Sequence, residues 1–159
     1  GLGGLLGAWR QRNNPLGSRR PFATPIAMRA FGPAPSLLEM EALARAALDR
    51  LPEPFAATAR EVILRVEEFA DEDTLRDMGI ESPYDLTGLY VGRPLTERSI
   101  EESGRFPDQV FLFRAPILLE WSEGEDSLEH LVTHVLIHEI GHHFGLSDED
   151  MHALEEAAA

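Results

Sequence analysis

Apolar residues recur at helical spacing in two stretches of the chain. In the first, which follows Ser36, they fall three or four positions apart and predict a helix that ends near Pro52. The residues concerned are Leu37, Met40, Leu43, Ala44, Ala47, Leu48 and Leu51. Ser36 and Glu39 have the spacing of a capping box, so the helix is expected to begin at Ser36. The second stretch predicts a strongly apolar helix over residues 127–144, with Gly145 as its stop.

Three further segments, residues 60–69, 86–91 and 109–119, have the composition of β-strands. They are rich in β-branched, aliphatic and aromatic residues, which suit a pleated and half-buried surface. Pro116 interrupts the third segment. Because proline in a sheet is largely confined to edges and bends, we expect this segment to be an edge strand or to bend at Pro116.

Two short elements complete the pattern. The acidic stretch over residues 67–77 is expected to form a solvated turn or a short helix. Asp148–Ala158 predicts a final helix, capped by Ser147 or by Asp148 itself. No internal repeat is visible.

The chain divides by composition into two parts. Residues 1–35 mix glycine, proline, arginine and asparagine without a helical or alternating period, which predicts a basic, flexible arm. Such an arm could bind an acidic partner, or it could simply be a terminus without a partner. Residues 36–159 are expected to form one domain, in which a polar loop over residues 94–107 separates the second and third strands.

The net charge of −14 is unevenly distributed. Residues 1–35 carry five arginines and no acid, so the other 124 residues hold nine of the 14 basic residues against all 28 acids, a net charge of −19. Such a surface repels phosphate backbones and anionic lipids, which argues against nucleic-acid or membrane binding by the folded part. We therefore expect a neutral or basic partner.

Two features that the sequence lacks limit the possible metal ligands and the expected location in the cell. The chain has no cysteine, so a metal would have to be held by imidazole and carboxylate groups. No apolar run approaches the roughly 18 residues that a membrane helix needs, and the opening residues lack the pattern of a signal peptide. A cytoplasmic protein is expected.

The pattern HExxHxxGxxD lies at the end of the second predicted helix and carries the chemistry. Residues four apart on a helix lie about one turn apart on the same face, so His138 and His142 can converge on one ion. Glu139 lies about 100° around the helix from His138, where it can reach a metal-bound water rather than the metal itself. Gly145 can take the left-handed conformation that ends the helix, and Asp148 is then placed to be the third ligand.

Three protein ligands leave one position of a tetrahedral zinc ion open, which is the arrangement of a catalytic site. Zinc lowers the pKa of a water in that position toward about 7, and Glu139 could take its proton and pass it to the leaving amine. The sequence thus predicts a zinc-dependent hydrolase of peptide bonds with one Zn²⁺ per chain. The alternative is a zinc-stabilised, non-catalytic module that binds peptides or proteins. Two imidazoles and a carboxylate also suit other divalent ions.

Other histidines and acids lie near the motif and are alternative candidate ligands. His134 and His130 precede His138 by one and two helical turns, and we expect His134 to pack behind the ligands and His130 to be exposed. His143 points about 100° away from His142 and is expected not to bind the metal. The rivals of Asp148 are Glu149 and His152.

Two further features of the sequence bear on the site: its possible donors to the oxyanion and the glycine inside the second helix. Possible donors to the oxyanion are Tyr90, Arg93, Arg98 and Arg114. In so acidic a protein, however, we expect the arginines to form ordinary salt bridges. Gly141 costs the helix about 1 kcal/mol relative to alanine. We therefore expect the helix to pack closely against the sheet at Gly141.

The motif at residues 138–148 resembles that of the zincin metallopeptidases, and its spacing is similar to the metzincin pattern with Asp148 in place of the third histidine. Residues 88–99, GLYVGRPLTERS, and 112–116, LFRAP, are similar to stretches found in a small bacterial family of predicted zincin-like metallopeptidases. The likeness covers roughly residues 36–157.

This resemblance implies an α+β fold, a minimal zincin-like domain in which a small mixed β-sheet packs on the metal-binding helix and on an N-terminal helix. It also implies an edge strand that pairs with an extended substrate, for which residues 109–115 are the candidate. Only 11 residues follow Asp148, which leaves no room for the C-terminal subdomain of larger metzincins. The cleft is therefore expected to be shallow, and Met151 stands too close to Asp148 to be assigned as a Met-turn.

Overall fold

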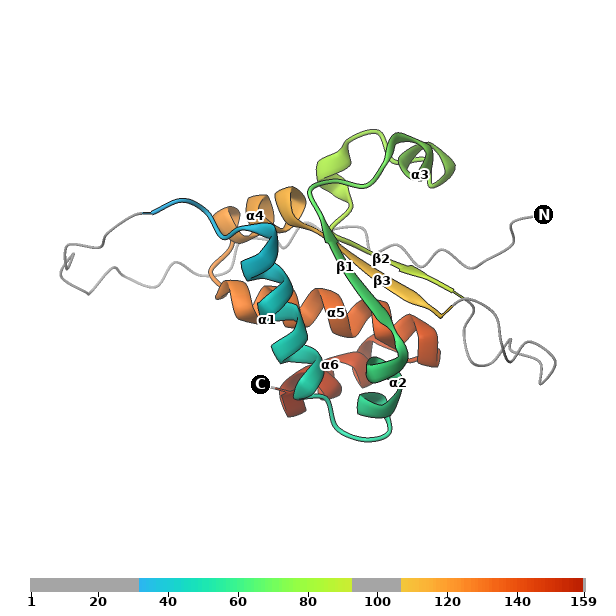
Figure 1. Ribbon diagram of the computed structural model, residues 1–159. Helices are drawn as coiled ribbons and strands as arrows, with labels where there is room; N and C mark the ends of the chain where they lie inside the picture. Colours follow the sequence, from blue (N-terminus) through green and yellow to red (C-terminus); the bar gives the residue numbers. More distant parts are fainter. Residues whose placement is uncertain (1–31, 93–106, 159) are drawn as a thin grey trace.

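The first helix, α1 (Leu37–Asp49), begins where the capping box predicts. Our computed structural model describes residues 32–92 and 107–158 of the chain (Figure 1). The Glu39 N–H donates to Ser36 Oγ at 3.1 Å, and the Ser36 N–H donates to Glu39 Oε2 at the same distance. A short helix that the sequence did not predict, α2 (Phe55–Glu61), follows α1 and takes the first residues of the segment expected to be a strand.

Three strands form a small mixed sheet, as expected: β1 (Ile63–Glu67), β2 (Gly88–Val91) and β3 (Gln109–Phe113). Their order is β1-β3-β2, with β3 parallel to β1 and antiparallel to β2. The assignment of residues 109–115 as the edge strand is therefore wrong. β3 lies in the centre, because its apolar side chains are buried on both faces, and β2 lies at the edge of the described sheet.

The predicted third strand is also too long, because β3 passes directly into helix α4 (Arg114–Glu123). Pro116 is the third residue of this helix and is buried. In the first turn of a helix the missing N–H of proline removes no intrahelical bond, so Pro116 fits into the start of α4 instead of bending a strand.

The acidic stretch forms the short helix α3 (Glu72–Asp77), whose N-cap is Asp71, and a 3₁₀ turn, η1 (Pro83–Asp85), leads to β2. The long apolar helix is α5 (Leu128–Phe144), with Ser127 as its N-cap. It ends at Gly145, which has φ 66°, the left-handed conformation expected of it.

The last helix, α6 (Asp148–Ala158), is capped by Ser147, whose Oγ accepts from the Asp150 N–H at 3.2 Å. No helix within the described ranges is both long and apolar enough to cross a bilayer. Most of the predicted arm and loop, together with Arg93 and Arg98, lies outside the described residues.

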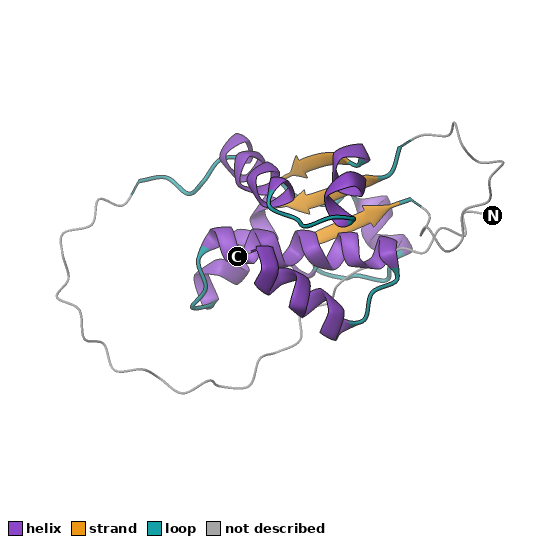
Figure 2. Cartoon of the chain, turned by 90° about the horizontal axis from the view of Figure 1, so that it is seen from below, coloured by secondary structure: helices purple, strands orange, loops and turns teal. Residues whose placement is uncertain are grey.

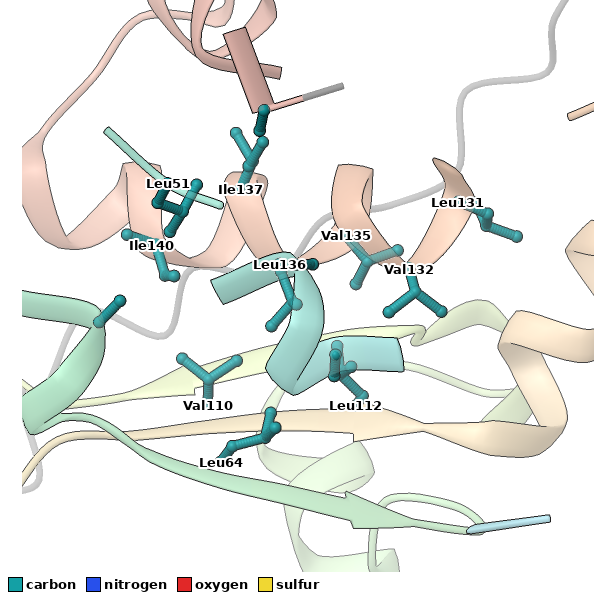
Figure 3. Packing of buried hydrophobic residues seen from close by; sticks show 14 of the residues in the cluster. Leu51, Leu64, Val110, Leu112, Leu131, Val132, Val135, Leu136, Ile137 and Ile140 are labelled. Carbon is teal, nitrogen blue, oxygen red and sulfur yellow. The ribbon is translucent and has the colours of Figure 1, made fainter. Parts of the chain in front are cut away.

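Helices α1 and α5 cover one face of the sheet and enclose the main core (Figures 1 and 2). Leu64, Val110 and Leu112 of the strands point toward α5, where Val132 and Leu136 meet them (Figure 3). A smaller apolar cluster lies around α3, β2 and β3 and contains Ala70, Leu75, Leu86, Leu89 and Phe113. Because side chains alternate along a strand, the sheet thus has buried residues on both faces.

Two glycines allow the close contacts of α5. A Cβ at Gly88 of β2 would lie 2.7 Å from Val135 Cγ1, so the edge strand approaches the helix at this glycine. A Cβ at Gly141 would lie 2.2 Å from Met151 Sδ. The helix is therefore packed closely at Gly141, as predicted. The neighbour is α6, however, and not the sheet that the prediction named.

Candidate metal centre

Helix α5 brings His138, Glu139 and His142 together beside the edge strand. Glu139 is completely buried, and the two histidines are half-buried. Within the described residues, both carboxyl oxygens of Glu139 and Nε2 of His142 are buried without a hydrogen-bond partner. Buried polar atoms are nearly always satisfied in folded proteins, so three orphaned atoms on one helical turn indicate a site for water or an ion. The donor set fits zinc.

Burial dominates the electrostatics of Glu139. Removal from water raises the pKa of its carboxyl to about 8. The backbone N–H of Tyr90 approaches the carboxyl and acts in the opposite direction, without reaching hydrogen-bonding geometry. Gly88 explains how the strand comes so close, because a Cβ there would lie 3.3 Å from Glu139 Cγ.

The two histidines are held in the form that binds metals. Burial, together with the neighbouring His134 and His142, lowers the pKa of His138 to about 4. Burial also lowers the pKa of His142. Metal ions bind the neutral imidazole, so few protons have to be displaced at neutral pH.

Asp148 is the first residue of α6 and is exposed. The chain reaches it through a tight turn in which the Leu146 N–H donates to the Gly141 carbonyl at 2.9 Å. The Asp148 carboxylate is near enough to raise the pKa values of both His138 and His142. In the described parts of the chain, however, no three His, Asp or Glu side chains are arranged to hold a metal ion. The ligand assignment therefore stays a prediction.

A hydrogen-bonded group of side chains lies behind His138. His134 Nδ1 and His130 Nε2 each lie 2.8 Å from a different carboxylate oxygen of Glu155 on α6. These bonds raise the pKa of His134 and, against the effect of burial, lower that of Glu155. The His134 and His138 rings lie 4.6 Å apart, so His134 packs behind a predicted ligand, as expected, and His130 is half exposed.

A second polar group lies beside the last turn of α5 and includes His143. The Tyr90 hydroxyl is hydrogen-bonded to Asp108 Oδ2 and to His143 Nδ1, and both Tyr90 and His143 are 1% exposed. Tyr90 thus points into this group rather than toward the predicted metal. Sequence reasoning overlooked Asp108 and Gly88; of the two, the glycine within a strand is a recognisable signal of close packing.

The remaining candidates lie elsewhere. Arg114 forms a salt bridge with Glu68 at 2.8 Å and donates to the Pro35 carbonyl at 2.6 Å, which is the structural role expected of it. Glu149 and His152 are exposed on α6, and His152 lies 3.5 Å from Glu156.

The fold and this site define a zincin-like domain. The model of the zincin-like metallopeptidase family matches residues 59–158, most of the chain, and the protein belongs to that family. The match spans β1, the edge strand and both helices of the site. The family generally binds zinc. Among curated proteins none matches the chain.

Proposed function

We propose that the protein is a zinc-dependent hydrolase of peptide bonds. The observation that carries this proposal is Glu139, a carboxyl group that is completely buried, has no hydrogen-bond partner within the described residues and stands on the same helical turn as two histidines. A purely structural zinc site has no need of such a group. Burying it without a partner is unfavourable, which favours a catalytic reason for its presence.

His138, His142 and Asp148 would hold the metal. Zinc, when bound there, supplies Lewis-acid polarisation of a carbonyl group and makes nearby water more acidic. In the described structure Asp148 is close to the two histidines without completing the ligand set, so we expect its side chain to turn toward them when zinc binds.

Glu139 would move the proton. The positive charge of a metal held nearby would favour the ionised form of Glu139 over the protonated form that burial favours. A carboxylate oxygen of Glu139 would then take a proton from the attacking water and return that proton to the leaving amine nitrogen. Water attacks the carbonyl carbon, the C–N bond breaks, and the products are a carboxylic acid and an amine.

An extended peptide is the substrate that the neighbouring strand suits. β2 lies at the edge of the described sheet and packs directly on Glu139 through Gly88. A peptide that added to this edge by backbone hydrogen bonds would pass beside the carboxyl group. We therefore propose β2, in place of residues 109–115, as the strand that pairs with the substrate.

Metal content tests the proposal most directly. We expect elemental mass spectrometry to find about one zinc per chain in the purified protein. His142→Ala should lose the metal and the hydrolysis of a mixed peptide library. The matched control is His152→Ala, which removes an exposed histidine of α6 and should change neither.

Glu139→Ala separates the enzyme from the binding module. We expect this variant to retain zinc and to lose hydrolysis, because Glu139 moves the proton but does not hold the ion. Full zinc content in His142→Ala would contradict the ligand assignment. Zinc in the parent protein without hydrolysis of any peptide would favour the zinc-stabilised binding module.

A further inference from the structure

Three buried polar side chains connect the edge strand to the end of the metal helix. Tyr90 comes from β2, His143 from the last turn of α5, and Asp108 directly precedes β3. The Tyr90 hydroxyl is bonded to both other side chains, and His143 Nδ1 lies 3.3 Å from Asp108 Oδ2. The aromatic rings of Tyr90 and His143 also lie in contact, with centroids 5.2 Å apart.

The direction of each hydrogen bond in this group follows from which atoms can donate and which can only accept. A carboxylate only accepts hydrogen bonds, so the Tyr90 hydroxyl donates to Asp108, and the His143 Nδ1–H then donates to the hydroxyl oxygen. The contacts thus assign a proton to Nδ1 of His143. Each member restricts the orientation of the next, as in other buried hydrogen-bonded networks.

The backbone around Asp108 is built to hold this side chain in place. The Ile63 N–H donates to the Asp108 carbonyl at 2.9 Å, which ties the residue to β1. A Cβ at Gly92 would lie 2.3 Å from Asp108 Oδ1, and Gly92 has φ 157°, a conformation that other residues rarely adopt. Glycine at the end of β2 is therefore needed for Asp108 to reach Tyr90.

The position of the group relates it to the metal centre. His143 follows His142 directly and stands two residues before Gly145, the turn that leads to Asp148. We propose that Tyr90, Asp108 and His143 form a polar clamp, which fixes the last turn of α5 against β2 and so positions His142 and Asp148. The proposal rests on the proposed function in that it takes these two residues as metal ligands.

Hydrogen bonds are directional, so a polar clamp can hold the end of α5 in one orientation. Apolar packing at the Tyr90 and His143 positions could be equally stable, but it would tolerate small rotations of the helix end. Hydrogen bonds among three side chains from different elements define one orientation. The side chains of the clamp are positioning groups: they are bonded to one another and take no part in the proposed proton transfer.

Tyr90→Phe tests the clamp with the smallest change, the loss of one hydroxyl. We expect the affinity for zinc, measured by competition with a chelator, to fall about tenfold, a typical effect of residues that orient metal ligands. The visible absorption spectrum of the Co²⁺-substituted protein should change as well, because it reports ligand geometry. Tyr84→Phe is the matched control, since Tyr84 is 45% exposed, and it should leave both unchanged.

His143 provides the rescue experiment. Asparagine places a nitrogen donor close to the position of Nδ1, so His143→Asn should retain most of the zinc affinity, whereas His143→Leu should lose it. A lower melting temperature with unchanged zinc affinity and Co²⁺ spectrum would reduce the clamp to an ordinary stabilising contact and overturn the proposal.

Hydrogen exchange tests the clamp independently of the metal. In the metal-free protein, we expect the amides in the last turn of α5 to exchange faster in Tyr90→Phe than in the parent or in Tyr84→Phe. If the parent bound no zinc, the proposed function would fail while this measurement still decided about the clamp. Equal exchange in all three proteins would refute it.

Discussion

At the residue scale, Glu139 shows a conflict between stability and chemistry. Its carboxyl group is completely buried without a hydrogen-bond partner in the described residues, and burial raises its pKa from the usual 4.5 to about 8. A group whose pKa is raised on folding destabilises the folded protein once the pH exceeds the unfolded value. Above about pH 4.5, the buried Glu139 carboxyl therefore lowers the stability of the metal-free protein.

Glu139→Gln should remove this conflict. We expect the metal-free variant to be more stable than the parent at pH 7, by about 2–3 kcal/mol, because each pKa unit corresponds to about 1.4 kcal/mol. Hydrolysis should fall by about 10²-fold or more while zinc is retained. Urea unfolding in the presence of a chelator measures the stability.

The pH dependence provides the control for Glu139→Gln. Below about pH 4.5 the carboxyl is protonated in both the folded and the unfolded chain, so the difference between the variant and the parent should disappear. A gain in stability that is equal at pH 4 and pH 7 would show that burial of the charge is not its cause.

At the scale of elements, the site depends on how α6 docks on α5. Met151 fills the space beside Gly141, where a Cβ would lie 2.2 Å from its sulfur. Gly141→Ala should therefore destabilise the protein, although alanine favours a helix by about 1 kcal/mol over glycine. The free energy of unfolding from chemical denaturation measures this effect.

The double variant with Met151→Ala identifies the cause. Removing the Met151 side chain makes room for the new methyl group, so Gly141→Ala should be less harmful, or even favourable, in the Met151→Ala background. Additive effects of the two substitutions would mean that the contact between α5 and α6 is not what requires glycine.

The two helices are also joined by Glu155, which is bonded to His130 and His134 of α5. Glu155→Gln should lower the free energy of unfolding by about 1–2 kcal/mol, because it weakens two hydrogen bonds that involve a charged group. Glu156→Gln is the matched control. Its side chain is 73% exposed and lies 3.5 Å from His152 on the same helix, so we expect almost no change.

At the scale of the whole molecule, the two helices of the candidate site carry charged residues of one sign. No lysine or arginine follows Arg114 in the sequence, so α5 and α6 carry acids and histidines as their only ionisable residues. Asp148 and Glu155 both act on His138, and Glu120 and Asp126 act on His134. From this distribution we predict neutral or basic substrates, which is the same expectation that the composition gives.

Cationic peptides should therefore be better substrates than anionic peptides of the same length. We expect kcat/KM to be at least tenfold higher for a peptide that carries arginine than for its glutamate counterpart, and this preference to shrink as salt is added. Glu149→Lys, beside Asp148, should reduce the preference. Asp77→Lys on the distant helix α3 is the control and should not (Figure 1).

Several helix ends could be predicted from the sequence because local hydrogen bonds set them. Ser36 and Glu39 place the start of α1, Ser127 the start of α5, and Gly145 its end, because caps and left-handed turns depend on a few adjacent residues. The one-turn spacing of His138 and His142 follows from helix geometry in the same way.

Features that depend on neighbours distant in the sequence could be found only from the folded chain. The central position of β3 depends on β1 and β2 pairing with its two sides, and the role of Pro116 on where that strand ends. The meeting of Tyr90, Asp108 and His143 joins residues up to 53 positions apart. A sequence pattern reports which faces are apolar, but the choice among partners for those faces is made by the packing of the whole chain.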